Sequence, residues 1–229
     1  MIKAVLFDLD GTLLNRDESL KSFILDQYSR LYDGLGHINK KQFTERFITL
    51  DNHGYVWKDK VYAQLIEEFD IQDYTVNFLL EDYMKHFKNH CIPFPNLIEM
   101  LRKLQNLGCS LGIISNGMTE FQLHNIRALG IESYFQTILI SEKEGLRKPD
   151  PLIFQKALEQ MKVSANECLF VGDHPENDVR ASKKVGMTSV WKKDTYWDNI
   201  IADYTIEDLI EIINIVEVLR SYESIRVNS

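Results

Sequence analysis

The 229-residue sequence is poor in cysteine and contains only Cys91, Cys109 and Cys168. They are odd in number, far apart and without the spacing of metal ligands, which excludes a disulfide framework or a zinc ribbon. We therefore read them as reduced thiols and expect a cytoplasmic protein.

Long hydrophobic runs and basic blocks are also missing. The N-terminal apolar run soon meets Asp8 and Asp10, so it is too short and too quickly charged for a signal peptide, and no other run is long enough to span a bilayer. The formal net charge is -8 and no block of Lys and Arg stands out. An acidic surface repels phosphate backbones, so we expect neither nucleic acid nor a membrane as a partner.

What is present is the composition of an ordinary globular protein. Hydrophobic residues make up 45% of the chain and charged residues 26%. The length allows one sizeable core, or a core with a small second module.

Short apolar runs and helical patterns alternate in the second half of the chain. Residues 4–9, 110–115, 137–141, 168–173 and 187–191 predict strands, and Asp150 followed by Pro151 predicts a helix start. Thr119 with Gln122 resembles a capping box, and a final helix is expected from about Thr205. This alternation predicts an α/β fold, a doubly wound parallel sheet with helices on both faces.

Residues 16–90 interrupt this pattern and show only helical spacing. Such a block is too long for a loop, so we predict an inserted all-helical domain, with residues 1–15 and 91–229 forming the α/β core. Trp57 shares a spacing of four with Val61 and Leu65, which favours core packing. For His53, Tyr55 and Lys58 in the same block, substrate contact and a structural role remain equally open.

Carboxylates follow two of the predicted strands. Asp8 and Asp10 end the first strand and point the same way, while Asp173 ends the fourth and Asp178 lies just beyond it. Ligands bind beyond the carboxyl ends of strands in open α/β sheets, so we expect these acids to gather there. Without a counter-charge they would be costly to bury or would become protonated. A hard divalent cation removes that cost, and the oxygen donors suit Mg²⁺.

Donors for a phosphate group lie at the same edge of the predicted sheet. Lys148, in a loop, adds a positive charge, and Ser115 ends the second strand with a hydroxyl. The backbone amides after Asp10, at Gly11 and Thr12, supply further hydrogen-bond donors.

Four segments resemble the motifs of a known family. FDLDGTL, IISNG, KPDPLIF and VGDHPEND occur in the order of motifs one to four of the haloacid dehalogenase (HAD) superfamily. The helical block resembles that family's cap domain, inserted between motifs one and two. The resemblance implies a Rossmann-like core and a phosphatase that depends on Mg²⁺.

The resemblance also implies roles for individual residues. Asp8 would be the nucleophile, carrying an aspartyl-phosphate, and a metal ligand. Asp10 would be the general acid/base and offer its carbonyl oxygen to the metal. Lys148 would stabilise charge, Asp173 would be a further ligand, and Asp178 would act through water or by orienting the site.

Two pairs of residues complete this reading of the motifs. The resemblance implies that Ser115 and Asn116 contact the substrate phosphate. His174 and Glu176 depart from the small hydroxyl residue often found after the motif-four aspartate, and we expect them to lie in a solvated loop.

We expect a phosphatase acting on a small phosphorylated metabolite, a nucleotide monophosphate or a sugar phosphate, as a monomer or homodimer. A phosphomutase of the sugar-phosphate type stays open as an alternative. A 2-haloacid dehalogenase is disfavoured because those enzymes lack the second aspartate of motif one, which is Asp10 here. A phosphoacceptor module like a response-regulator receiver is disfavoured because such domains are much shorter and lack the helical insert.

Overall fold

The computed structural model describes the backbone of residues 1–227 and the side chains of residues 1–221. The chain divides into two compact units. The first, the α/β unit, comprises residues 1–15 and 93–229, and the second, the helical unit, comprises Arg16–Ile92.

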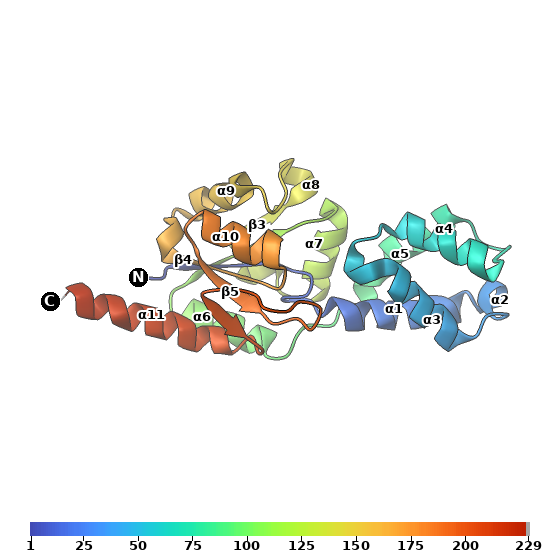
Figure 1. Cartoon of the computed structure of the whole chain (residues 1–229), viewed down its shortest axis with the longest axis horizontal. Coiled ribbons are helices and arrows are strands. Elements are labelled where there is room, and N and C mark those ends of the chain that lie inside the picture. Colours follow the sequence, from blue (N-terminus) through green and yellow to red (C-terminus); the bar gives the residue numbers. More distant parts are fainter. Residues whose placement is uncertain (228–229) are drawn as a thin grey trace. The chain divides into compact units, whose positions relative to one another are not determined.

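The α/β unit is built on one parallel sheet (Figure 1). Its six strands lie in the order β3-β2-β1-β4-β5-β6. Their bounds are β1 Ala4–Phe7, β2 Ser110–Ser115, β3 Thr137–Ile140, β4 Cys168–Gly172, β5 Thr188–Lys192 and β6 Tyr204–Ile206. The α/β class with a parallel sheet, expected from the sequence, is confirmed.

Strand β1 occupies the centre of this sheet. Its four residues AVLF are all buried, and Ala4 lies opposite Ser110 of β2 on one side and Cys168 of β4 on the other. A strand covered on both faces reads as a continuous apolar run, which is why no alternation of polar residues marks it. The first residues beyond β1 therefore emerge in the middle of the sheet's carboxyl edge.

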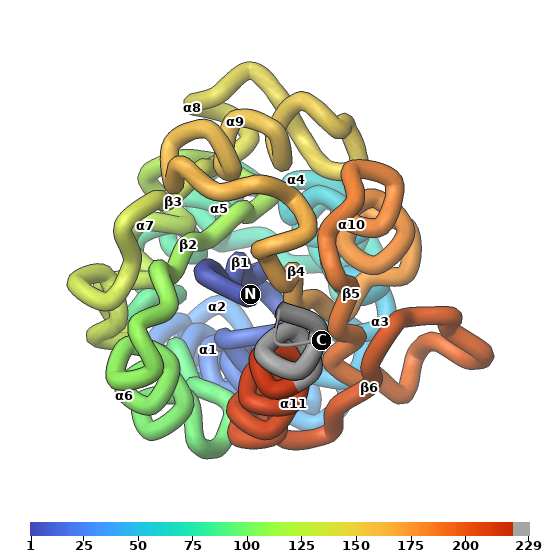
Figure 2. Tube along the Cα trace, turned by 90° about the vertical axis from the view of Figure 1, so that its left-hand side faces the viewer, coloured from blue at the N-terminus to red at the C-terminus, as the bar shows by residue number. Residues whose placement is uncertain are grey.

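Helices cover both faces of the sheet (Figure 2). On one face, α9 (Pro151–Met161) packs against β2 and β3, and α10 (Ala181–Lys184) packs against β5. On the other face, α6 (Leu97–Asn106) packs against β2, and α11 (Glu211–Val227) packs against α6 and β6. The unit also contains α7 (Thr119–Ala128), α8 (Ser141–Glu144) and a π-helical turn, Pro175–Arg180.

The local signals that predicted α9 act as expected. The Asp150 side chain accepts a hydrogen bond from the Leu152 amide, and Pro151 is the first helical residue. Proline suits this position because its missing N–H would have no partner within the helix. Ser164 and Glu167 form a capping box just before β4.

The C-terminal region differs from the sequence prediction. Residues 204–206 form the edge strand β6, with Ile206 buried against the sheet, and the last helix begins at Glu211 instead of about Thr205. The short Tyr-Thr-Ile run has β-branched residues that suit a strand, but three residues are too few for a periodic signal.

The helical unit contains the five helices α1 Arg16–Arg30, α2 Tyr32–Leu35, α3 Lys40–Asp51, α4 Lys58–Phe69 and α5 Val76–His86, with short 3₁₀ turns at Asn52–Gly54 and Phe87–His90. Residues Leu20, Phe23, Ile24 and Tyr28 of α1 are buried, in the spacing of one helical face. Among the described residues 16–92 there is no strand, as the sequence predicted.

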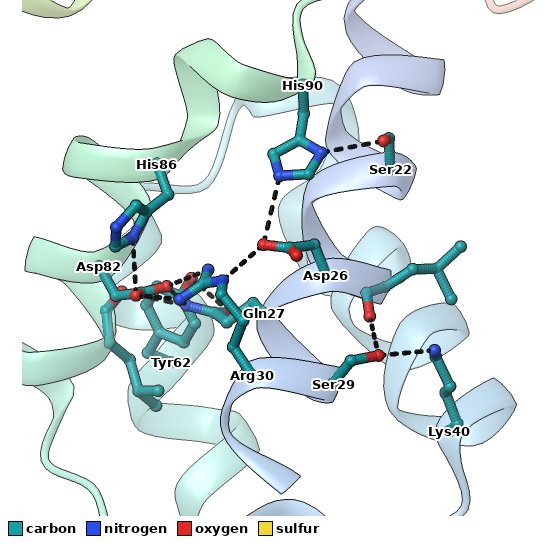
Figure 3. Close-up of polar contacts among 12 residues, drawn as sticks. Ser22, Asp26, Gln27, Ser29, Arg30, Lys40, Tyr62, Asp82, His86 and His90 are labelled. Atoms are coloured by element: carbon teal, nitrogen blue, oxygen red, sulfur yellow. Dashed lines mark hydrogen bonds and ion pairs between the residues drawn. The ribbon is translucent and has the colours of Figure 1, made fainter.

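A polar network joins three helices of this unit (Figure 3). The Arg30 guanidinium donates to both carboxylate oxygens of Asp82, at 2.6 and 2.9 Å, and its Nε donates to Asp26 at 2.5 Å. Gln27 donates to Asp82 at 2.9 Å and accepts from the Tyr62 hydroxyl at 3.0 Å. Two-pronged arginine–carboxylate pairs fix geometry as well as charge, so α1, α4 and α5 are held in one arrangement.

Two further details of the helical unit correct or refine the sequence reading. Trp57 is 65% exposed and precedes α4 as its N-cap residue, so the core packing predicted for it is wrong. The unit extends to Ile92, whose amide donates to the Ser19 hydroxyl, while Pro93 already bridges to Leu14 of the α/β unit. No helix in the described part of the chain is both long and apolar enough to cross a membrane.

Candidate active site

Three carboxylates meet beyond the carboxyl ends of the central strands. Asp8 follows β1, Asp173 follows the neighbouring strand β4, and Asp178 lies in the π-helical turn after it. Each of them offers an oxygen atom within 4.8 Å of the others. The side chain of Asp10 is not part of this group, which we call the carboxylate cluster.

Lys148 is buried within the carboxylate cluster. Its Nζ donates to Asp8 Oδ1 at 2.5 Å and to Asp178 Oδ1 at 2.6 Å, and the residue is only 3% exposed. Burial alone would lower the pKa of Lys148, but the charges of Asp178 and Asp8 outweigh it and raise that pKa. The lysine therefore stays charged and gives Asp8 and Asp178 a shared counter-ion.

Lys148 alone does not balance these three acids. Burial raises the pKa of Asp8 to about 7, with Lys148 opposing the rise and Asp178 and Asp10 adding to it. The pKa of Asp173 is also raised, first by burial and then by the charges of Asp8 and Asp178. Carboxylates crowded in this way bind protons readily unless a second cation joins them. Their oxygen donors fit a hard divalent ion.

Backbone geometry packs the cluster tightly. A Cβ atom at Gly11, which has a φ of +83°, would lie 2.5 Å from Asp173 Oδ2, and one at Gly172 would lie 2.4 Å from Asp178 Cβ. Glycine at both positions lets the backbone approach the carboxylates. The His174 amide donates to Asp178 Oδ2 at 3.0 Å, so both oxygens of Asp178 have partners in the protein.

The donors expected at Gly11 and Thr12 are engaged within the protein. The Gly11 amide donates to the Leu14 carbonyl at 2.9 Å, and the Thr12 amide donates to the Leu9 carbonyl at 3.3 Å. The Thr12 hydroxyl, which is buried, donates to Asp173 Oδ1 at 3.3 Å. In this structure Gly11 and Thr12 therefore shape the turn and orient Asp173.

Asn116 faces the backbone of Lys148. Its Nδ2 donates to the Lys148 carbonyl and its Oδ1 accepts from the Lys148 amide, both at 2.9 Å. The sequence predicted that Asn116 contacts the substrate phosphate. In the structure, both polar atoms of its side chain instead bind the backbone of Lys148.

Ser115 and Asp10 are linked by a residue to which sequence reasoning gave another role. Gln122 Nε2 lies 2.9 Å from Ser115 Oγ and 2.5 Å from Asp10 Oδ2. The capping box predicted for Thr119 and Gln122 is wrong, because Met118 is the N-cap residue of α7 and has no side-chain cap bond. The only signal in the sequence was a polar residue on the inward face of an amphipathic helix.

His174 is not a solvated loop residue. Its Nδ1 accepts from the Glu176 and Asn177 amides at 3.1 and 3.2 Å, so it caps the π-helical turn, and burial lowers the pKa of His174. Glu176 is exposed, as expected, and pairs with Arg180 at 2.8 Å.

In the helical unit, the three residues left open by the sequence separate into two kinds. Lys58 is buried and makes a short ion pair with Asp51, which also accepts from Arg16 at 2.8 Å and from the Gly54 amide at 2.9 Å. Lys58 therefore stabilises the turn between α3 and α4 through this ion pair. His53 and Tyr55 lie on that turn and are exposed, and His53 lines a cavity of about 200 Å³ within the unit.

Comparisons with known proteins identify the family of this chain. The family model described as haloacid dehalogenase-like hydrolase matches residues 5–192. The glyceraldehyde 3-phosphate phosphatase of Methanocaldococcus jannaschii is 31% identical over 96% of this chain and 99% of its own length. A putative pyrophosphatase, PpaX, of Clostridium perfringens is 30% identical over 96% of this chain and 100% of its own.

A solved structure supports the same assignment. A HAD phosphatase from Thermococcus onnurineus superposes with a TM-score of 0.67 at 31% identity, covering 94% of this chain and 98% of that one. Like the relatives above, it is named as a phosphatase. The chain therefore belongs to the haloacid dehalogenase-like hydrolases, as an enzyme of their phosphatase branch.

Proposed function

We propose that this enzyme is a Mg²⁺-dependent phosphatase that hydrolyses a small phosphorylated metabolite through an aspartyl-phosphate on Asp8, in the cytoplasm. The observation that carries the proposal is the buried Asp8 carboxylate, which shares Lys148 with Asp178 and lies beside Asp173. This arrangement combines a nucleophile, a fixed cation and oxygen ligands at one edge of the sheet.

Asp8 and Asp173 would hold the metal, together with the carbonyl oxygen of Asp10. Asp178 is bonded to Lys148 and to the His174 amide through both its oxygens, which supports an orienting role. When bound, Mg²⁺ supplies positive charge that neutralises the acids and polarises the phosphoryl group.

The chain's own residues account for the two chemical steps. One Asp8 oxygen attacks phosphorus in line with the leaving oxygen, and Asp10 donates its proton to that oxygen as the P–O bond breaks. Asp10 then removes a proton from the water that attacks the acyl phosphate, which frees Asp8 and inorganic phosphate. Lys148 stabilises the charge on the transferring phosphoryl group throughout.

Among small phosphorylated metabolites, we place sugar phosphates ahead of nucleotide monophosphates. Glyceraldehyde 3-phosphate, for which the archaeal relative is named, is a small sugar phosphate. We assign specificity to the helical unit, where His53, Tyr55 and Trp57 expose their side chains on one turn.

The test is phosphate release from p-nitrophenyl phosphate, measured with and without Mg²⁺ for the wild type and the Asp8→Asn variant. We expect release to require Mg²⁺ and to fall by about 10³-fold or more in Asp8→Asn, since loss of a nucleophile removes the covalent route. Asp198→Asn, at an exposed acid of the same unit, is the matched control. Undiminished phosphate release by Asp8→Asn would contradict the proposal. Chloride release from 2-chloropropionate would instead indicate a dehalogenase, and isomerised hexose phosphate with little free phosphate would indicate a phosphomutase.

A further inference from the structure

Gln122 is a buried amide on the first turns of α7 and is only 3% exposed. Its neighbour one turn on, Asn125, is fully buried. A primary amide taken out of water costs free energy unless its hydrogen bonds are replaced, so the partners of Gln122 matter.

Those partners belong to two of the family motifs. Gln122 Nε2 lies 2.5 Å from Asp10 Oδ2, 2.9 Å from Ser115 Oγ and 3.3 Å from the Asn116 carbonyl oxygen. An amide nitrogen has two hydrogens, so the two nearest oxygens, on Asp10 and Ser115, are the natural acceptors. The bond to Asp10 is charge-assisted whenever that carboxylate is ionised.

The orientation of the Gln122 amide is set from both ends. Asn125 Nδ2 donates to Gln122 Oε1 at 3.1 Å, which places the nitrogen end toward Asp10. The reverse orientation would bring the amide oxygen against the Asn116 carbonyl oxygen, which accepts hydrogen bonds and donates none. Gly117 leaves the room for this arrangement, because a Cβ there would lie 3.0 Å from both Cγ and Nε2 of Gln122.

We propose that Gln122 is a positioning residue that holds the Asp10 carboxylate beside Ser115, so that the general acid and a phosphate-binding hydroxyl keep a fixed relation. Because Gln122 Nε2 donates to Ser115 Oγ, the Ser115 proton turns away from the amide and becomes available to a phosphate oxygen. The inference rests on the role proposed above for Asp10, and it adds a residue of α7 to those that support the proposed reaction.

The experiment uses variants that remove the donor and keep the side-chain volume. Gln122→Met replaces the amide with an apolar chain of similar size, and Gln122→Glu is isosteric but has no N–H and donates no hydrogen bond when ionised. Ile126→Val, a buried change on the same helix that leaves the network intact, is the matched control. Circular dichroism and thermal melts check that each variant is folded.

The readout is the first turnover on a series of aryl phosphates whose leaving groups become progressively more basic, with enzyme in excess. A basic leaving group depends on protonation by Asp10, whereas p-nitrophenolate needs little help. We expect Gln122→Met and Gln122→Glu to lower the rate for the ester with the most basic leaving group about tenfold more than the rate for p-nitrophenyl phosphate. A general acid held in place contributes about 10²–10⁴-fold to the rate, and the variants should lose a part of that contribution. Ile126→Val should slow both equally or neither.

An equal loss across the series, or no loss, in variants that fold would overturn the proposal, since both outcomes describe a merely structural glutamine. A double-mutant cycle supplies the second test. In the Asp10→Asn background, Gln122→Met should lower the first-turnover rate by less than about threefold. A loss of rate as large as in the wild-type background would show that Gln122 acts without Asp10. Failure of the proposed function is separate, because it appears as Mg²⁺-independent release by the wild type or as activity of Asp8→Asn, both with Gln122 unchanged.

Discussion

Asn116 and Lys148 exchange two hydrogen bonds, each 2.9 Å long, although they lie 32 residues apart in the sequence. The asparagine amide mimics a backbone partner and joins the end of β2 to the loop before α9. Through this pair, the position of Lys148 in the carboxylate cluster depends on a side chain that holds the lysine backbone.

Asn116→Ala should therefore reduce kcat/KM by about 10²-fold, the scale expected when a reacting group shifts by an ångström. The reason is that the Lys148 amide and carbonyl lose their partners and the loop is free to relax. Steady-state kinetics with p-nitrophenyl phosphate measures the effect. Asn106→Ala, at an exposed position on α6, should leave kcat/KM unchanged. Wild-type activity in Asn116→Ala would show that the loop holds Lys148 without the pair.

Lys148→Met should lower the thermal midpoint in metal-free buffer, because Asp8 and Asp178 lose their shared counter-ion in a buried setting. Added Mg²⁺ should raise the midpoint more in this variant than in the wild type, since the ion takes over the missing charge. Activity should fall by about 10²–10³-fold even with Mg²⁺, as when one charge-stabilising donor is removed.

The control for that variant is Lys103→Met, which breaks an exposed ion pair with Glu99 on α6. Such surface pairs contribute about 1 kcal/mol or less, so its midpoint should change little with or without Mg²⁺. A Lys148→Met protein as stable as the wild type without metal would contradict the electrostatic account of the cluster.

Asp51 should make the stability of the helical unit depend on pH. Burial alone would raise the pKa of Asp51, but the charges and hydrogen bonds of Arg16 and Lys58 outweigh it and lower that pKa. A carboxyl whose pKa is depressed on folding stabilises the protein above its unfolded value of about 4 and loses that contribution as the pH falls through its folded pKa.

Denaturation of the wild type and Asp51→Asn at several pH values tests this. At pH 7 the variant should be less stable by about 3 kcal/mol, because two mostly buried cations lose their anion. Below about pH 4 the gap should narrow, since the unfolded wild type takes up a proton at Asp51 that the folded protein binds only at lower pH. Asp59→Asn, at an exposed acid of α4, should show neither effect. A gap that is constant with pH would exclude the ion pairs as its source.

Trp57→Ala should change the free energy of unfolding by no more than about 0.5 kcal/mol, because the side chain is 65% exposed. Leu65→Ala, at a fully buried position of α4, should lower the free energy of unfolding by about 2–5 kcal/mol. Equilibrium denaturation of both variants gives the comparison. A loss of several kcal/mol in Trp57→Ala would restore the packing role that its spacing suggested.

Much of the fold could be predicted because it depends on local patterns. Apolar runs bounded by glycine, the Asp150–Pro151 helix start and the uniform helical spacing after Arg16 are properties of neighbouring residues. The edge strand β6 escaped prediction because three residues carry no measurable period, and Trp57 misled because a spacing of four also arises at a residue just outside the helix.

The sequence by itself determined the alternation of strands and helices up to β5, the acids at the strand ends and the family to which the chain belongs, since each of these depends on short contiguous segments. Only the tertiary structure decided which polar groups meet. It turned Gln122 toward Asp10, joined Asn116 to the Lys148 backbone and paired Arg16 with Asp51. The physical reason is that a buried donor takes whichever acceptor packing brings within about 3 Å, and that choice depends on segments far apart in the chain.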